Sequence, residues 1–459
     1  MKKLLLGYAI LAVLLAITTR AQSDDGQWKD SATYVPGSTQ KICQVTGETD
    51  QEFGTFTVSR TATRYGMAGA DLGYSFEHNG MLFFLFGDAA PTKTFNGYPN
   101  GRSDPPRDPN YDDAIGFTSL THLTTCPKLD FIPDSIGAYQ SPVLAPVTLR
   151  TNEMPIAGIS EGGRMYVIFG TDNPYANPPY SSPPPLNGIQ NLDAGPTRTV
   201  VGVSDDNAHT FRYLYDFSTS DLTSLPNYNA KFIYTAIARG HDEYLYIWGS
   251  EGGLQFRNSL PCLARKKAFL MDQPGETEYF AGLGADGHPL FSWSERDAVP
   301  LFADYDGPNF TPKNCMAHKG VQWNPYVELW VMLYDCSDET PQNLPGIYMR
   351  TAEQLWGPWS VPQTIFNAKR DNGSCVFIYS DSSGPCPNPG GQTAAGGNYA
   401  PYFIAPLATG DERTATSTFY WTMATFDPYT QVIMKTTIQG PQEAGSTSGK
   451  YTDDDGFAP

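Results

Sequence analysis

The hydrophobic pattern of the chain is dominated by five short runs of consecutive apolar and aromatic residues. Each run follows a polar turn and tends to end at a small or acidic residue. An uninterrupted apolar run of this length is typical of a strand with both faces buried. The runs begin about every 79 to 90 residues and occupy 81–86, 165–172, 244–251, 329–335 and 419–424.

The even spacing of these runs predicts a repeated all-β unit. No amphipathic helix pattern separates them, and the 44 glycines and 38 prolines suit many strands joined by tight turns. Several short strands per repeat are typical of a β-propeller, here with five blades and long loops. Two stacked sandwich domains are the alternative, but no polar linker marks a boundary between them. We therefore expect a lead-in segment over 22–55, a single propeller domain over 56–440 and a disordered tail over 441–459.

The first 21 residues have the three parts of a secretory signal peptide. Lys2 and Lys3 precede an apolar run over 4–17, and Ala21 ends a small-residue cleavage site. The run is short for a membrane span, which makes an uncleaved anchor the less favoured alternative. We expect a secreted, extracellular protein that has no membrane association once the signal peptide is cleaved.

Export also favours disulfides among the seven cysteines, whose spacing matches no zinc pattern. Cys375 and Cys386 flank a loop rich in Pro, Gly and Ser, so they are the simplest pair to predict. Cys315 and Cys336 can link neighbouring strands. The odd number leaves one thiol free, and Cys262, inside a strand-like run, is the candidate.

Composition and charge exclude several classes of partner. The net charge of −18 repels polyanions, which argues against nucleic acid and against anionic membrane surfaces. A neutral polymer such as a polysaccharide is compatible with this charge. The chain contains no nucleophile elbow, phosphate loop, dinucleotide fingerprint or zinc motif. We expect a monomer that uses no cofactor and no metal ion.

The most informative stretch, 64–90, is typical of two strands joined by a turn at Asn79-Gly80. Asp71 lies among small residues of the first strand, and Asp88 follows Gly87 at the end of the second. Each strand therefore presents one carboxylate from a rigid platform, and the small residues leave room for another group to approach. The alternative is that both are ordinary turn or strand-end residues.

Several motifs resemble those of one known family and occur in the same order. The family was catalogued as domain of unknown function 4185 and became glycoside hydrolase family 183, the D-arabinanases. The resemblance covers roughly residues 56 to 438, but not the insertions over 174–196 and 367–397, so substrate choice can differ. It implies a five-bladed propeller that cleaves α-D-arabinofuranosyl linkages in mycobacterial arabinogalactan and lipoarabinomannan, acting within the chain if its cleft is open. The motifs are at 64–73 with 82–88, 256–265, 321–332, 347–360 and 398–402.

The resemblance also implies roles for individual residues. Glycoside hydrolysis needs one carboxyl group to protonate the leaving oxygen and a second to attack or to activate water. Asp71 and Asp88 match the family's opening motif, and we expect them to be this pair. We expect four further kinds of residue at the site: acids at strand ends, arginines that bind sugar hydroxyls, aromatic rings that stack on sugars, and one histidine. Each also has a structural alternative, as a turn cap, a member of an ion pair or a core residue. The predicted substrate-binding residues are Arg64, Tyr65, Asp113, Asp172, Trp248, Glu251, Arg257, His318 and Trp323.

Two other functions remain open at this point. Because a fold does not determine a function, the propeller can bind carbohydrate without cleaving it. It can also be a furanosidase that acts on another polysaccharide, such as L-arabinan or fructan.

Overall fold

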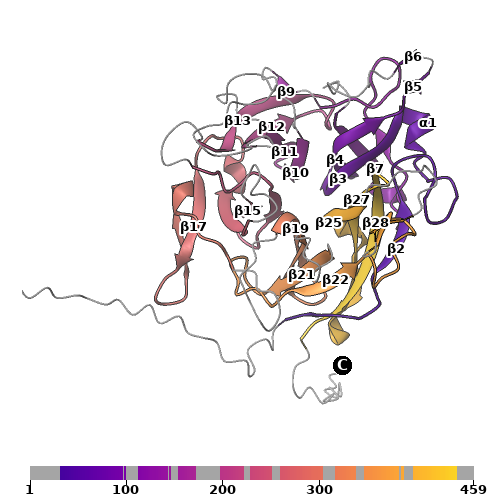
Figure 1. Cartoon of the computed structure of the whole chain (residues 1–459). Coiled ribbons are helices and arrows are strands. Elements are labelled where there is room, and N and C mark those ends of the chain that lie inside the picture. The colour runs from indigo at the N-terminus through magenta and orange to yellow at the C-terminus, as the bar shows by residue number, and fades with distance from the viewer. Residues whose placement is uncertain are drawn as a thin grey trace, which may run out of the picture.

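The computed structural model is a ring of five β-sheets arranged as the blades of a propeller (Figure 1). The predicted all-β, five-bladed fold is therefore confirmed. The structure describes residues 31–96, 98–99, 112–142, 144–145, 154–171, 197–221, 228–250, 259–302, 316–336, 346–381, 384–386 and 396–441.

The first three blades follow one another along the chain. Blade 1 contains β3 (Met67–His78), β4 (Met81–Pro91), β7 (Ala114–Ser119) and β8 (Asp130–Phe131). Blade 2 contains β10 (Met154–Glu161), β11 (Arg164–Thr171), β12 (Arg198–Ser204) and β13 (Phe211–Thr219), with β9 (Leu144–Ala145) parallel to β13. Blade 3 contains β14 (Ala236–Arg239), β15 (Tyr244–Gly249), β16 (Cys262–Lys267), β17 (Thr277–Leu283) and β18 (Pro289–Ser292).

The last two blades differ because the fifth also contains the N-terminal strands. Blade 4 contains β19 (Met316–Asn324), β20 (Leu329–Cys336), β21 (Gly346–Ala352) and β22 (Gln363–Asn367). Blade 5 contains β25 (Gly397–Phe403), β26 (Thr409–Asp411), β27 (Thr416–Phe426) and β28 (Thr430–Gln439), together with β1 (Thr33–Tyr34) and β2 (Gln40–Gln44).

Small elements lie outside the blades. The helix α1 (Thr61–Tyr65) leads into β3 and ends at Gly66, which adopts a left-handed conformation, as glycine does at many helix ends. Two short ribbons and several 3₁₀ turns complete the described elements: β5 (Thr94–Phe95) with β6 (Tyr98–Pro99), β23 (Ser380–Asp381) with β24 (Gly384–Pro385), η2 (Leu120–His122), η4 (Ala268–Leu270), η5 (Glu295–Asp297), η7 (Ala405–Leu407) and η8 (Glu412–Thr414).

The ring closes where both ends of the chain meet in blade 5. Strands β1 and β2 pair with β28, so part of the predicted lead-in segment belongs to the propeller sheet. The innermost strands contact each other in the order β3, β10, β14, β19, β25 and back to β3. In Figure 1 the yellow strands of blade 5 lie beside the indigo strands of blade 1. The ends of the chain therefore hold the first and last blades together.

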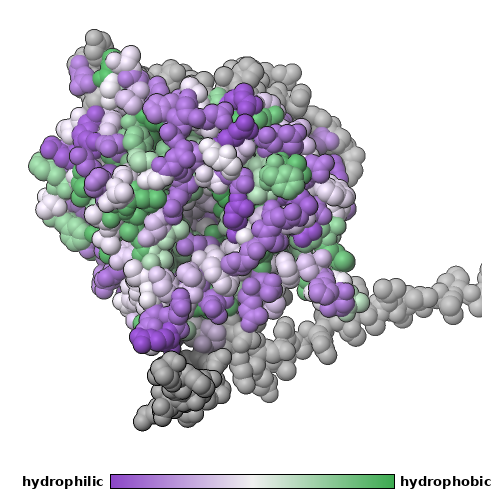
Figure 2. All heavy atoms as spheres, turned by 180° about the vertical axis from the view of Figure 1, so that it is seen from behind, coloured by the Kyte–Doolittle hydropathy of each residue, from purple (hydrophilic) through white to green (hydrophobic). Residues whose placement is uncertain are grey.

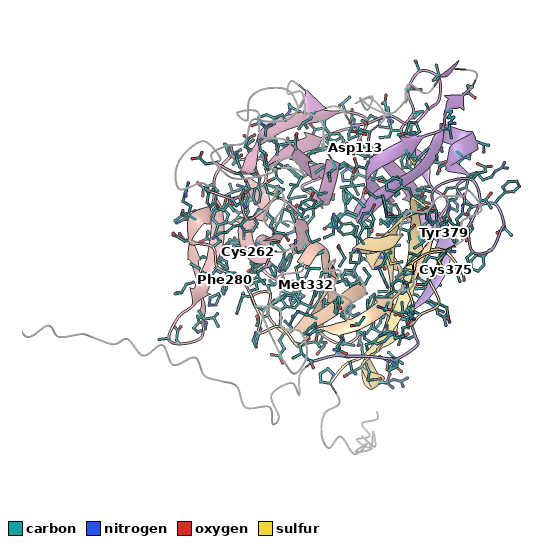
Figure 3. All side chains as sticks on the ribbon, viewed as in Figure 1. Asp113, Cys262, Phe280, Met332, Cys375 and Tyr379 are labelled. Atoms are coloured by element: carbon teal, nitrogen blue, oxygen red, sulfur yellow. A yellow bond between two sulfur atoms is a disulfide. The ribbon has the colours of Figure 1, made fainter. Side chains whose placement is uncertain are left out.

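The five apolar runs of the sequence are the second strands of the five blades: β4, β11, β15, β20 and β27. A second strand is covered on both faces by neighbouring blades, which explains why its apolar run is uninterrupted. Trp248, Trp330 and Trp421 on these strands are at most 2% exposed. Side chains fill the space between the sheets (Figure 3).

The disulfides follow the prediction in part. Cys375 and Cys386 are bonded as expected, and Cys262 is a free, buried thiol in blade 3. Cys336 is also disulfide-bonded, whereas its predicted partner Cys315 lies outside the described residues. A bond that was not predicted joins Cys43 to Cys126. It links β2 of blade 5 to blade 1 and so adds a covalent connection across the ring closure.

Candidate active site

The strand register gathers acidic residues on one face of the ring. In each blade the start of the inner strand pairs with the end of the second strand, as Asp71 pairs with Gly87 in blade 1. The end of β4 therefore carries Asp88 to this face, the end of β20 carries Asp335, and Asp427 follows β27. The predicted residues Asp172, Glu251 and Arg257 lie outside the described residues.

Asp71 lies at the junction of blades 1 and 5. Its side chain is 8% exposed, and its Oδ2 accepts a 2.8 Å hydrogen bond from the hydroxyl of Tyr399 on β25. Its Oδ1 lies over Gly87, so close that a Cβ there would be 3.2 Å away. Gly87 precedes Asp88 directly, so the two predicted residues lie at neighbouring positions of the paired strands β3 and β4.

Asp88 is held by contacts to its backbone. It is half-buried, with a φ of 44°, and its N–H lies 3.3 Å from Oδ1 of Asp113. Its carbonyl oxygen accepts a 2.9 Å hydrogen bond from the hydroxyl of Tyr429 in blade 5. Asp113 is 2% exposed and lies on the side of blade 1 that is nearer to blade 2 (Figure 3). Its N–H donates to the hydroxyl of Ser141 at 2.8 Å. These contacts fix the position of Asp88 while leaving its side chain partly accessible.

The small residues around Asp71 allow a neighbouring blade to pack closely against β3. A Cβ on Gly69 would lie 2.0 Å from the carbonyl oxygen of Tyr429, and a Cβ on Gly73 would lie 2.7 Å from Nε2 of Gln431. The space that these glycines leave is therefore filled by blade 5. The group that approaches at these two positions is therefore part of the protein itself.

The predicted substrate-binding residue His318 also lies on this face, near the start of β19. It is 8% exposed, its Nδ1 lies 3.2 Å from Oδ1 of Asp335, and its backbone N–H donates to the same oxygen at 2.9 Å. Its ring centroid is 5.2 Å from that of Tyr234 and 5.7 Å from that of Tyr399. Contacts between blades 3, 4, 5 and 1 thus lead from Tyr234 through His318 and Tyr399 to Asp71.

Burial shifts the pKa values of two residues at this site, Tyr399 and Lys319. Burial, and after it the negative charge of Asp71, raise the pKa of the Tyr399 hydroxyl well above its ordinary value. On β19, Lys319 is 1% exposed and donates to the carbonyl oxygen of Tyr234 at 2.8 Å. Burial lowers the pKa of Lys319 to about 7, against the opposing effect of the Asp335 carboxylate. Because the pKa of Tyr399 is raised, its hydroxyl stays a hydrogen-bond donor at neutral pH.

Arg64 and Tyr65 have structural partners rather than a place near Asp71. Arg64 forms an ion pair with Asp130 on β8, the outermost strand of blade 1, and also donates to the carbonyl oxygens of Ser59 and Leu129 at 2.9 Å. The hydroxyl of Tyr65 donates to the same Asp130 carboxylate at 3.0 Å. The interpretation of these two residues as substrate-binding is corrected, because α1 directs them toward the outer edge of the blade.

The two predicted tryptophan platforms are packing residues. Trp248 is completely buried on β15, where its ring centroid is 6.3 Å from that of Trp330, so no sugar can stack on it. Trp323 lies at the end of β19 opposite to His318 and packs against His241 at 4.4 Å and Trp330 at 5.6 Å. Both were singled out because aromatic side chains are common in known sugar sites, but here they fill the space between blades 3 and 4.

Two residues of the site were missed by sequence reasoning. Asp335 ends the run of β20 at the place where Asp88 ends that of β4, and this shared position could have identified it. Tyr399 lies within the motif at 398–402, but its contact with Asp71 joins residues 328 positions apart. A single sequence carries no signal for that contact.

The geometry can be set beside known proteins. Residues 57–435 match the family model described as "Domain of unknown function (DUF4185)". The chain belongs to this family. The contacts that connect Asp71, Asp88, Asp113, Tyr399 and Tyr429 lie entirely within the matched part of this DUF4185 domain. No curated protein matches the chain.

Several solved propeller structures are similar to this DUF4185 chain. An exo-β-1,3-galactanase from Phanerochaete chrysosporium has 11% sequence identity and a TM-score of 0.40, and the match covers 86% of this chain and 64% of that one. This chain thus spans slightly less than two thirds of the galactanase. An α-L-arabinofuranosidase from Podospora anserina has 8% identity and a TM-score of 0.39, with 82% and 93% covered. Another from Clostridium thermocellum has 12% identity and a TM-score of 0.36, with 77% and 81% covered. The similarity concerns the fold alone.

Two further observations bear on the predicted partners. In the part of the chain that the structure describes, no three His, Cys, Asp or Glu side chains are grouped as metal ligands would be. No helix among the described residues is both long and apolar enough to cross a bilayer.

Figure 2 shows one face of the ring, where hydrophilic residues predominate around a hollow near the centre.

Proposed function

We propose that this protein is an exported glycoside hydrolase that cleaves α-D-arabinofuranosyl linkages within D-arabinan. The observation that carries the proposal is the position of Asp71. Its carboxylate lies over Gly87, the residue that precedes Asp88, on the face where the inner strands begin. Hydrolysis of a glycosidic bond requires two carboxyl groups, and the paired strands β3 and β4 hold Asp71 and Asp88 at neighbouring positions.

Asp71 and Asp88 can divide the two chemical tasks. One carboxyl group protonates the glycosidic oxygen as its bond to the anomeric carbon breaks, and the other attacks that carbon or removes a proton from the attacking water. The inner strand β3 and the second strand β4 hold the two residues, so little reorganisation is needed before reaction. The His318 ring lies 5.7 Å from that of Tyr399, which donates to Asp71, and Oδ1 of Asp113 lies 3.3 Å from the Asp88 nitrogen, so both residues are candidates to contact a bound sugar.

The substrate class rests on the sequence motifs rather than on the geometry. The motifs at 64–73, 321–332 and 398–402, with the others described above, resemble those of glycoside hydrolase family 183. The net charge of −18 is compatible with a neutral furanose polymer. Export is proposed from the signal-peptide pattern over 1–21, and N-terminal sequencing of protein recovered from culture medium tests it: a mature chain starting near residue 22 is expected.

A substrate panel tests the proposed activity. The purified mature protein is incubated with D-arabinan from mycobacterial arabinogalactan, with lipoarabinomannan, with L-arabinan and with fructan, and released oligosaccharides are separated and identified. We expect arabinofuranosyl oligosaccharides of several lengths from the two D-arabinan substrates alone. Release from L-arabinan or fructan only would overturn the proposed substrate but keep the hydrolase.

A binding assay on the same polymers separates an enzyme from a binding module. Retention on immobilised D-arabinan without any release of oligosaccharides would identify a non-catalytic carbohydrate-binding propeller. Neither retention nor release on the whole panel would overturn both functions.

A further inference from the structure

Two exposed phenylalanine rings lie in blade 5, on the face of the ring that carries Asp88. Phe426 is 53% exposed and is the last residue of β27, which ends where the inner strand β25 begins. Phe53 is 52% exposed and follows β2, whose last residue pairs near the start of β28 on the same face. A single exposed apolar side chain needs no explanation, whereas several that are connected on one face are typical of a binding surface.

The turn between β27 and β28 connects Phe426 to the candidate active site. The hydroxyl of Tyr429 in this turn donates to the carbonyl oxygen of Asp88 at 2.9 Å. Phe426 itself pairs with Gly397, the first residue of β25. A Cβ on Gly397 would have no described atom within 4 Å apart from those of its chain neighbours, so the space beside this strand start is open. A ligand bound next to Asp88 can therefore extend along the turn to Phe426.

Tyr379 connects the same turn to Phe53. Its backbone N–H donates to the carbonyl oxygen of Asp427 at 2.9 Å, and its hydroxyl donates to Oε1 of Gln51 at 2.8 Å. Tyr379 lies on the side of the ring that blade 5 occupies (Figure 3). Two residues after Gln51, the ring of Phe53 lies 4.3 Å from the ammonium group of Lys41. Lys41 thus supports the Phe53 ring from the protein side, and the exposed part of the side chain is left for a ligand.

We propose that Phe53 and Phe426 form an aromatic track, a surface on which a neutral furanose polymer binds beyond the bond that is cleaved. This inference rests on the proposed function, because it names where the rest of the same polymer is held. The negative faces of the two rings attract the C–H groups of sugars that lie along the track. The amide nitrogen of Gln51, whose oxygen accepts from Tyr379, can donate to a sugar hydroxyl between them.

The chemistry of the aromatic track suits a sugar polymer better than a protein partner. Its two rings are separated by the polar groups of Tyr379 and Gln51, whereas the centre of a protein interface is a continuous apolar patch. The track also continues directly from Asp88 through Tyr429, so one polymer can occupy both. Phe53 precedes residues 57–435, which match the family model, so this end of the track lies outside the family match.

The double substitution Phe53→Ala with Phe426→Ala tests the aromatic track. It is made in Asp88→Asn protein, so that binding of D-arabinan fragments is measured by titration calorimetry without cleavage. We expect the Kd for long fragments to rise roughly 10-fold, the loss expected when two partly covered rings are removed. The Kd for a disaccharide, which is too short to reach both rings, should change much less. Because both rings are exposed, the urea midpoint should stay the same.

Phe269→Ala in the same background is the matched control. Phe269 is 65% exposed and lies in η4, beyond the end of β16 that is opposite to the candidate site. We expect this variant to bind long fragments as tightly as its parent. An equal loss of affinity in both variants, or none in the double variant, overturns the proposal. Normal polymer binding by the double variant, together with loss of a dimer seen by analytical ultracentrifugation, would instead assign the two rings to a contact between copies of this chain.

Cleavage assays separate this inference from the proposed function. With Asp88 intact, the double variant should have a higher KM for polymeric D-arabinan and an unchanged kcat for the shortest oligosaccharide that the wild type cleaves. If the wild type cleaves D-arabinan and the double variant binds and cleaves it equally well, the aromatic track fails while the proposed function stands. If the double variant loses affinity but the wild type cleaves nothing, the proposed function fails while the track stands. A wild type that binds none of the polymers overturns both.

Discussion

The tight junction between blades 1 and 5 predicts a large effect of one methyl group. In Gly69→Ala the new Cβ would lie 2.0 Å from the carbonyl oxygen and 3.1 Å from the carbonyl carbon of Tyr429. Ordinary van der Waals contact for a Cβ begins near 3.4 Å. Both atoms belong to backbone, so β3 and the turn before β28 must move apart.

The magnitude follows from two opposing effects. Replacing Gly by Ala where the backbone allows it stabilises a protein by about 0.4–1 kcal/mol, because the unfolded chain loses freedom. Overpacking of a filled site costs about 1–3 kcal/mol, and more when backbone must shift. The clash therefore outweighs the gain, and we expect the free energy of unfolding to fall by about 1 kcal/mol or more.

Gly397→Ala is the matched control, because Gly397 begins an inner strand as well. Among the described residues, no atom outside its two chain neighbours lies within 4 Å of the position that a Cβ would take there, so we expect only the gain from the unfolded state. Urea unfolding followed by circular dichroism should show a lower midpoint for Gly69→Ala and an equal or higher midpoint for Gly397→Ala. Gly69→Ala should also lose activity, because Tyr429 holds the Asp88 carbonyl. Equal midpoints for the two variants would refute the tight packing of blade 5 on blade 1.

Two further predictions concern buried charge and the corrected residues. Because burial lowers the pKa of Lys319 to about 7 in the folded protein from an ordinary value of 10.5, the unfolded chain binds more protons between these two values. The stability of the wild type should therefore rise with pH from about 7 to 10.5, by up to a few kcal/mol. Lys319→Met should lack this rise, and parallel urea midpoints of the two proteins over this range would contradict the explanation. Since Arg64 pairs with Asp130 at the outer edge of blade 1, Arg64→Gln should cost about 1 kcal/mol of stability and leave KM unchanged. A several-fold rise in KM at unchanged stability would instead indicate that Arg64 binds substrate.

The fold was predictable because the second strand of each blade leaves a strong local pattern. Burial on both faces makes β4, β11, β15, β20 and β27 uninterrupted apolar runs, and their spacing gives the number of blades. The closure by β1 and β2 was not predictable, since it pairs residues nearly 400 positions apart. Neither β1 nor β2 carries a local sequence pattern that indicates which strand it pairs with.

Candidate site residues could be named from the sequence only where chemistry coincides with a strand end or a family motif. Asp71 and Asp88 meet that condition, and the strand register places them on one face of the ring. Trp248 does not, because a run of aromatic residues looks the same whether it packs a core or binds a sugar. Tyr399 acts through a contact with another blade, which is a property of the closed ring and not of the local sequence.

The central claim is that Asp71 and Asp88 carry out hydrolysis of D-arabinan, and one rate measurement tests it most directly. Initial rates of oligosaccharide release from purified D-arabinan are compared for the wild type, Asp71→Asn and Asp88→Asn, with circular dichroism confirming that all three are folded. We predict that each variant loses roughly 10²-fold or more of its rate, as expected for loss of an acid, a base or a nucleophile, while binding of the polymer persists. Near-normal rates in either variant would contradict the assignment.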